Sequence, residues 1–119
     1  MTARVLDISI EQGSQWVAVI TCRDADNVPL DLTGYEARMQ IRATADAVAT
    51  MLSITSTGVS PAIVVTAATG VLTITIPATS TASLTAGSAV YDIEIYPSEA
   101  AARKVLRGNV DIVAEVTHA

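Results

Sequence analysis

The sequence contains no phenylalanine, one cysteine and one histidine among its 119 residues, and aromatic residues make up only 3% of it. With Cys22 as the single cysteine, an internal disulfide and a cluster of thiolate metal ligands are both excluded. His118 stands next to the end of the sequence, where a side chain is poorly fixed for acid–base catalysis. No glycine-rich phosphate loop and no HExxH pair occurs. We therefore expect a protein that is not an enzyme, with no catalytic residues, no metal and no cofactor.

Positive charge is also scarce. The chain has 7 lysine and arginine residues against 12 aspartate and glutamate residues, which gives a formal net charge of -5. Such a chain repels phosphate backbones and anionic lipid, so we expect neither nucleic acid nor a membrane surface as a partner. Apolar runs such as residues 17–20 and 62–65 are far shorter than the ~20 residues that a membrane-spanning helix needs. We expect a soluble protein.

Aliphatic residues are abundant instead. Hydrophobic residues make up 50% of the chain, and the mean hydropathy is +0.46. A chain of this length and composition forms one compact domain, here residues 1–119. Its core must be built from valine, isoleucine, leucine and alanine rather than from aromatic rings.

Apolar and polar residues alternate along most of the chain, and turn residues interrupt the pattern about every ten residues, which is typical of short antiparallel strands. The clearest case is residues 35–43, where Ala37, Met39 and Ile41 are expected to face the core. We also expect strands at residues 6–10, 16–22, 51–55, 63–65, 71–76, 91–95 and 104–117, with a bulge at Gly108. The other residues expected to face inward are Leu72, Ile74, Ile76, Tyr91, Ile93, Ile95, Leu106, Val110, Ile112, Ala114 and Val116.

Helix is expected only at residues 79–86. This stretch fits a short helical turn with a Thr or Ser cap at its start, Leu84 as its apolar anchor and Gly87 at its C′ position. Residues 44–50 are rich in alanine and fit either a loop tip or a short helical turn. Seven or eight short strands, with one helical corner before the strand of Tyr91, favour an all-β, immunoglobulin-like antiparallel sandwich over a barrel.

The strand at residues 16–22 is apolar on both sides. Val17, Val19 and Thr21 lie on the side that should face water, where polar residues are normal. β-Branched apolar residues in such positions imply cover by another chain or by another segment of this one, although isolated exposed valines are also common. We expect Val17, Val19 and Thr21 to form a protein interface.

Two small-ligand sites are weaker hypotheses. The carboxylates of Asp24, Asp26 and Asp31, with Asn27, could gather oxygens around calcium, but their spacing matches no EF-hand and equally suits a hairpin tip. This alternative stays open.

A carbohydrate site would need exposed aromatic platforms. Trp16 and Tyr91 fall on core faces, so only Tyr35 and Tyr96 remain for that purpose.

Several stretches together resemble the N-terminal immunoglobulin-like domain of phage baseplate upper proteins and related small single-domain phage proteins. They span about residues 8–116 and are Ile10-Glu11-Gln12-Gly13, Asp31-Leu32-Thr33-Gly34-Tyr35, Met39-Gln40-Ile41-Arg42, Gly70-Val71-Leu72-Thr73-Ile74-Thr75-Ile76, Leu84 with Gly87, Tyr91-Asp92-Ile93-Glu94, and Leu106 with Gly108.

This resemblance implies a virion structural protein without catalytic residues, assembled in the host cytoplasm. In the larger relatives the domain precedes a fibre or a receptor-binding part. Here the resemblance implies a module that docks on other phage structural proteins, either as a tail or baseplate accessory or as a capsid decoration or cement protein. A carbohydrate- or receptor-binding module of the virion surface is the alternative. Copy number and self-association are left open.

Overall fold

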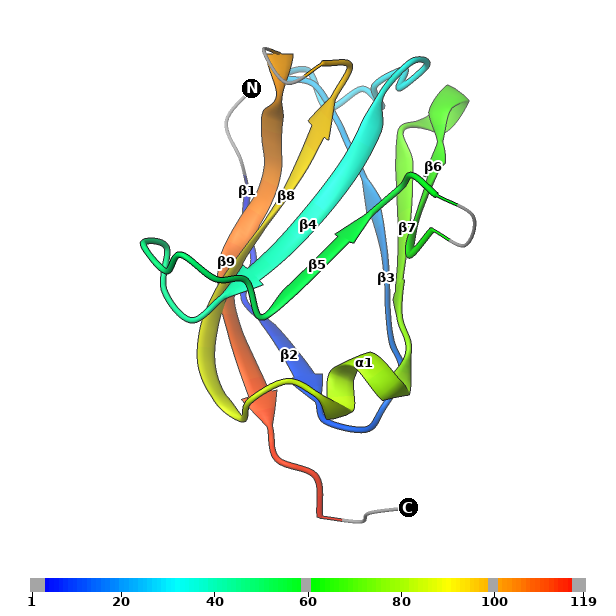
Figure 1. The fold of residues 1–119 in the computed structure, drawn as a ribbon. Coiled ribbons are helices and arrows are strands. Elements are labelled where there is room, and N and C mark those ends of the chain that lie inside the picture. The colour runs from blue at the N-terminus through cyan, green and yellow to red at the C-terminus, as the bar shows by residue number, and fades with distance from the viewer. Residues whose placement is uncertain (1–3, 59–60, 99–100, 117–119) are drawn as a thin grey trace.

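The computed structural model describes residues 4–58, 61–98 and 101–116, and these form two β-sheets packed face to face (Figure 1). The larger sheet contains β1 (Arg4–Val5), β2 (Ile8–Glu11), β4 (Glu36–Arg42), β5 (Leu52–Thr55), β8 (Gly87–Tyr96) and β9 (Arg103–Val113). The smaller sheet contains β3 (Trp16–Thr21), β6 (Ile63–Thr66) and β7 (Val71–Ile76). A 3₁₀ turn, η1 (Ala67–Thr69), joins β6 to β7, and a short helix, α1 (Ala78–Ala82), crosses from the smaller sheet to the larger.

The strand order confirms the immunoglobulin-like sandwich. The larger sheet runs β1-β9-β8-β4-β5, with β2 also on β9, and the smaller sheet runs β3-β7-β6. In immunoglobulin terms, β9-β8-β4-β5 correspond to strands G-F-C-C′ and β3-β7-β6 to B-E-D. The described residues form nine strands rather than seven or eight, because the N-terminal segment is divided into β1 and β2, which both run parallel to β9.

The core between the sheets is almost entirely aliphatic. Burial alternates along all of β4, and Ala37, Met39 and Ile41 are buried as expected. The expected inward residues of β7, β8 and β9 up to Ile112 are buried as well: Leu72, Ile74, Ile76, Tyr91, Ile93, Ile95, Leu106, Val110 and Ile112. Because two stacked sheets bury only alternate residues, this periodicity sets which side of each strand faces inward.

Two predictions for the last strand were wrong. Ala114 and Val116 were expected to face inward, but both are exposed. The reason is that β9 ends at Val113, which lies opposite Glu11, the last residue of β2. Beyond that point no strand of the described residues lies opposite the chain, so the alternation of the sequence no longer corresponds to an inner and an outer side.

The bulge was also expected at the wrong residue. The register between β8 and β9 shifts at Ile93 and Glu94, so the additional residue is Val105, which is buried together with its neighbour Leu106. Gly108 is paired regularly with Tyr91. A Cβ atom at Gly108 would overlap the backbone carbonyl of Leu6, so glycine is needed here for the close approach of the N-terminal segment.

The helical corner is present but shorter than expected. Helix α1 begins one residue earlier, after Pro77, and no side chain caps its N-terminus, so the predicted Thr or Ser cap was wrong. Gly87 is the first residue of β8 rather than the C′ residue of the helix. Leu84 is buried as the predicted anchor, and the buried Thr81 hydroxyl donates to the carbonyl oxygen of Ser14 at 2.9 Å.

Tyr91 ties the N-terminal segment to the larger sheet. Its ring is buried, and its hydroxyl donates to the backbone carbonyl oxygen of Leu6 at 2.7 Å. Burial, with a smaller contribution from the charge of Asp7, raises the pKa of Tyr91 to about 12, so the hydroxyl stays protonated as a donor. The Tyr91 hydroxyl thus bonds back to the backbone, as in the tyrosine corner of immunoglobulin folds, although here the acceptor lies between β1 and β2.

Replacing Tyr91 with phenylalanine should lower the free energy of unfolding by about 1 kcal/mol, since the Leu6 carbonyl loses its donor. Urea denaturation followed by circular dichroism measures this change. Tyr96→Phe is the matched control, because Tyr96 is half-buried and its ring contact with Arg38 does not need the hydroxyl. Equal effects of the two substitutions would contradict the role given to the Tyr91 hydroxyl.

Candidate docking interface

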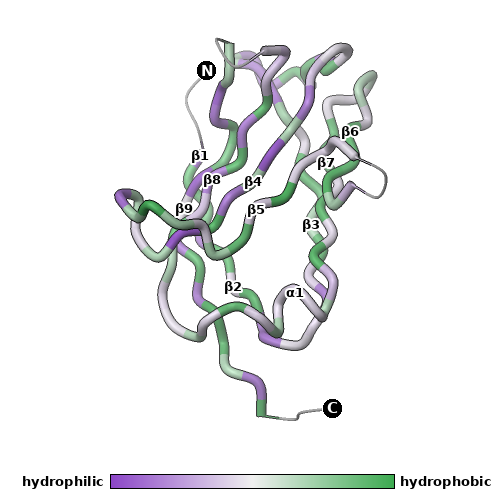
Figure 2. The backbone as a smooth tube through the Cα atoms, viewed as in Figure 1, coloured by the Kyte–Doolittle hydropathy of each residue, from purple (hydrophilic) through white to green (hydrophobic). Residues whose placement is uncertain are grey.

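The three strands of the smaller sheet contain no charged residue. Their outward side chains form what we call the Val/Thr face. Figure 2 shows that the two sheets differ in hydropathy, with hydrophilic segments on β4, β8 and β9 of the larger sheet and mostly hydrophobic or neutral residues on β3, β6 and β7 of the smaller one. The Val/Thr face consists of Val17, Val19, Thr21, Val64, Thr66, Val71, Thr73 and Thr75.

The register aligns these residues in rows across the sheet. Val19 lies opposite Thr73, which in turn lies opposite Val64. Every outward residue is β-branched, and such side chains have little rotamer freedom to lose when they are covered. Val17 is 56% exposed, Val19 67% and Val64 53%, so the apolar groups of this face are open to a partner. The result is a flat, stiff, uncharged surface.

Of the residues predicted for an interface, Val17 and Val19 lie on the outer side of β3 and are exposed, whereas Thr21 is half-buried. Val64 was not among the predicted interface residues, but the strand order places it in the same row as Val19. The alternation of β6 was the available signal, because a strand that begins with buried Ile63 must turn its second residue outward. The alternation also predicts that Val71, Thr73 and Thr75 face away from the core, but it gives no reason to join them to the residues of β3, and Thr66 lies beyond the predicted strand of residues 63–65.

The outer side of the larger sheet has the opposite character. Arg38 Nε lies 2.9 Å from Glu94 Oε1, and Lys104 Nζ lies 3.1 Å from Glu94 Oε2 and 3.0 Å from Asp92 Oδ2. The Arg38 guanidinium also stands 4.5 Å from the centre of the Tyr96 ring. This network binds β4, β8 and β9 together and keeps that side of the sandwich hydrated.

The network shifts the acid–base properties of its members. Burial acts to raise the pKa of Glu94, but hydrogen bonds and charges from Arg38 and Lys104 outweigh it, so the pKa lies below its ordinary value. Burial acts to lower the pKa of Lys104, and Asp92 and Glu94 outweigh it in the same way, so that pKa is raised. Both shifts favour the charged forms.

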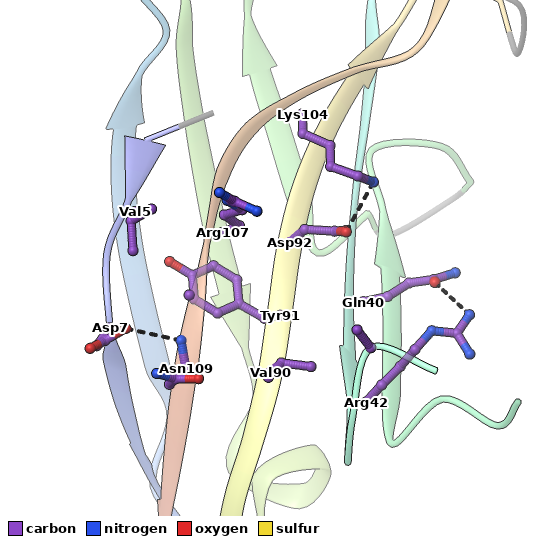
Figure 3. Close-up of a pocket in the computed structure, with 12 residues that line it drawn as sticks. Val5, Asp7, Gln40, Arg42, Val90, Tyr91, Asp92, Lys104, Arg107 and Asn109 are labelled. Atoms are coloured by element: carbon purple, nitrogen blue, oxygen red, sulfur yellow. Dashed lines mark hydrogen bonds and ion pairs between the residues drawn. The ribbon is translucent and has the colours of Figure 1, made fainter. Parts of the chain in front are cut away.

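A groove of about 520 Å³ lies on the same charged side. Figure 3 shows the side chains that line it. Arg42, Lys104 and Arg107 line it together with Asp7 and Asp92. Asp92 is paired with Lys104, and Asp7 accepts a hydrogen bond from the backbone of the β9 strand at 3.0 Å. Within the described residues, the Arg107 guanidinium makes no hydrogen bond or ion pair, so the groove has one cationic group available to a ligand.

Arg42 binds the segment of residues 44–50, for which the sequence allowed either a loop tip or a short helical turn. Its Nη1 donates to the carbonyl oxygens of Ala47 at 2.7 Å and Val48 at 2.9 Å, and its Nη2 donates to Gln40 Oε1 at 2.9 Å. Residues 44–50 are accordingly a loop of turns and bends rather than a helical turn. This loop closes one end of the groove through Ala45.

The acidic loop between β3 and β4 uses its carboxylates within its own turns. Asp24 Oδ1 accepts from the backbone N–H groups of Asp26 at 2.9 Å and Val28 at 3.0 Å. Asp31 Oδ1 accepts from the backbone N–H and the hydroxyl of Thr33, and these bonds lower the pKa of Asp31. These contacts are typical of self-capped turns. Among the described residues, no group of three or more His, Cys, Asp or Glu side chains gathers as a metal site.

The environment of the single cysteine disfavours reactivity. Cys22 is buried at the end of β3, and burial raises the pKa of its thiol, which disfavours the reactive thiolate. His118 lies outside the described residues.

No protein-family model matches this sequence, and no curated protein matches it with significant similarity. The resemblance to phage baseplate proteins therefore stays a prediction. Among the helices of the described residues, none has the length and apolar character that crossing a bilayer requires.

Acidification should destabilise the fold through Glu94. Because the folded-state pKa of Glu94 lies below its ordinary value of 4.5, its contribution is present above that pH and is lost as the pH falls further. Glu94→Gln should lower the free energy of unfolding at pH 7 by about 0.5 kcal/mol and make it less dependent on pH between about 5 and 3. Urea titrations across that range measure both effects.

The control is Glu11→Gln, which removes an exposed carboxylate that makes no ion pair among the described residues. A native-like acid dependence in Glu94→Gln would show that the network does not set it.

Proposed function

We propose that this protein is a non-enzymatic structural component of a bacteriophage particle, an immunoglobulin-like module that docks on other particle proteins through the Val/Thr face. The observation that carries the proposal is that β3, β6 and β7 contain no charged residue, and that their outer side holds only valine and threonine. A side that must remain in water has no need to exclude charge so strictly.

The chemistry of the face suits docking better than catalysis. Covering an exposed valine contributes on the order of 1 kcal/mol, and stiff β-branched side chains lose little entropy in doing so. The threonine hydroxyls provide donors and acceptors for a partner without the desolvation cost of full charges. A face of this size binds weakly as one copy and firmly when many copies act together on a symmetric shell or ring.

The phage assignment is supported by the sequence motifs between about residues 8 and 116. Within a particle, the module fits either the tail and baseplate or the capsid surface as a decoration protein. Its copy number in purified particles separates these positions, since a shell carries many more copies than a tail ring. The identity of the neighbouring genes separates them independently.

A second function, recognition of a carbohydrate or another receptor on the virion surface, is favoured by the groove on the larger sheet. Arg107 presents there a guanidinium that has no partner among the described residues, next to the Lys104–Asp92 ion pair. Guanidinium groups bind carboxylates and phosphates in bidentate fashion, so the ligand class for this groove is an acidic glycan.

The docking proposal predicts that Val17→Asp combined with Val19→Asp abolishes incorporation into particles. Both side chains are exposed, so the thermal midpoint of the isolated protein should stay close to the native value. Val64→Asp, on the far strand of the same face, should have the same effect on incorporation. Quantitative mass spectrometry of purified particles, made by supplying each variant to a phage that lacks the gene, gives the measurement.

Val48→Asp is the matched control, because Val48 is 98% exposed but lies on the loop of residues 44–50. Particles that contain normal amounts of the Val17/Val19 and Val64 variants would show that docking uses another surface.

The second function predicts a loss of glycan binding when the groove is changed. If the protein binds an acidic glycan there, Arg107→Gln should weaken that binding about tenfold, since one charge-assisted contact is removed. Arg23→Gln makes the same change of charge on the β3–β4 loop and should leave binding unchanged. An array of acidic glycans probed with the native protein tests the premise, and absence of binding to every member would eliminate this second function.

A further inference from the structure

The outer edge of β3 is open, and the hydrogen-bond pattern identifies which backbone groups it presents. The N–H of Cys22 donates to the carbonyl oxygen of Gly70 at 2.7 Å, across the ladder from β3 to β7. In an antiparallel pair, successive residues point their backbone groups alternately toward and away from the partner strand. Since Cys22 points toward β7, the backbone groups of Val17, Val19 and Thr21 point away from it.

A second hydrogen bond gives the same alternation from the other side of β7. The N–H of Thr75 donates to the carbonyl oxygen of Ala62 at 2.8 Å, so Thr75 points toward β6. Its partner in the β3–β7 register is Val17, which therefore receives no bond from β7. The open edge thus carries the N–H and C=O groups of three alternate residues, and no described residue pairs with them.

This edge lacks the features that usually prevent strands from pairing with other chains. Short length, charged side chains, proline and bulges are the common protections. The other outer strands have them: β5 and β6 are only 4 residues long, Pro61 precedes β6, and the β1–β2 segment carries Asp7 and Glu11. β3 has 6 residues, an unbroken register with β7, no proline and no charge.

We propose that β3 pairs antiparallel with β3 of a second copy of this chain, around a two-fold axis at Val19. In this register Val19 lies opposite Val19 of the second copy, and Val17 lies opposite Thr21 of the second copy. Antiparallel strands place the same residue of both copies at the axis, as an isologous interface requires. This is the register in which all of the open N–H and C=O groups of both edges find partners in each other.

The distribution of charge favours a second copy as the occupant. Continued beyond the strand, the same register puts Arg23 opposite Gln15 of the second copy and Asp24 opposite Ser14 of the second copy. No like charges meet, although the chain as a whole carries a net charge of -5. The acidic and basic side chains of the larger sheet lie on the opposite outer side of the sandwich and do not oppose the pairing.

Pairing in this way joins the two smaller sheets into one continuous sheet with the strand order β6-β7-β3-β3-β7-β6. A two-fold axis perpendicular to a sheet keeps the same side of both halves outward, so the two Val/Thr faces form one surface twice as wide. The inference rests on the β3 edge alone and goes beyond the proposed phage role, since it concerns the free protein.

Cysteine cross-linking tests the register. Residues that form a hydrogen-bonded antiparallel pair have Cα atoms about 5.5 Å apart, which lies within the range of a disulfide. Under mild oxidation, Val19→Cys should give disulfide-linked dimers in high yield. Val17→Cys is the matched control, because it should cross-link several-fold less with itself and efficiently with Thr21→Cys in a mixture. The native Cys22 is buried and does not compete.

Proline tests the backbone pairing. Val19→Pro removes an N–H that bonds to no described residue, so the fold should be retained while the dimer is lost. Sedimentation velocity over a range of protein concentrations measures the mass. If Val19→Pro fails to fold, Val19→Lys provides the same test through a charge at the edge. The native chain should double in mass with concentration, and both variants should remain monomeric.

A native chain that stays monomeric at every concentration would overturn the inference, as would equal cross-linking by Val19→Cys and Val17→Cys. The two proposals also fail separately. Val64→Asp lies on the Val/Thr face but away from the β3 edge, so it should leave the dimer intact while it abolishes incorporation into particles.

Discussion

The pairing of the N-terminal segment with β9, rather than with β3, determines what this molecule offers to other proteins. The backbone ladders of β1 and β2 with β9 hold the segment there. They are supported by the close approach of the Leu6 backbone to Gly108, the hydrogen bond from the Tyr91 hydroxyl to Leu6, and the bond from the Asn109 N–H to the carboxylate of Asp7. Because one segment cannot cover two edges, completing the larger sheet leaves the smaller sheet open. The stability of one edge and the availability of the other thus have a single structural cause.

The two sheets divide the surface chemistry between them. The ion pairs of Arg38, Asp92, Glu94 and Lys104 concentrate hydration on the larger sheet, and the smaller sheet carries only neutral side chains. A sandwich can do this because its two outer sides are independent of each other once the aliphatic core holds the sheets together. The core therefore constrains only the inner residues of each strand and leaves the outer ones free for interaction.

The sequence predicted well whatever depends on neighbouring residues. Period-two alternation located β4, β7 and β8 and the inward residues Met39, Ile74 and Ile93, because the side of a residue in a strand follows from its position alone. The strand order was out of reach, since it depends on contacts such as that between Asp7 and Asn109, which are 102 residues apart. For the same reason Val17 and Val19 could be recognised as unusual, while their neighbour Val64 could not be assigned to the same surface.

The single tryptophan of the chain has an optical consequence. Trp16 is the first residue of β3 and is only partly buried against the core. Its indole is the one strong near-ultraviolet fluorophore of the chain, and it sits on the strand whose edge is open. The emission of Trp16 therefore reports on the surroundings of β3, both when the edge of that strand is covered and when the core against which the indole packs is opened.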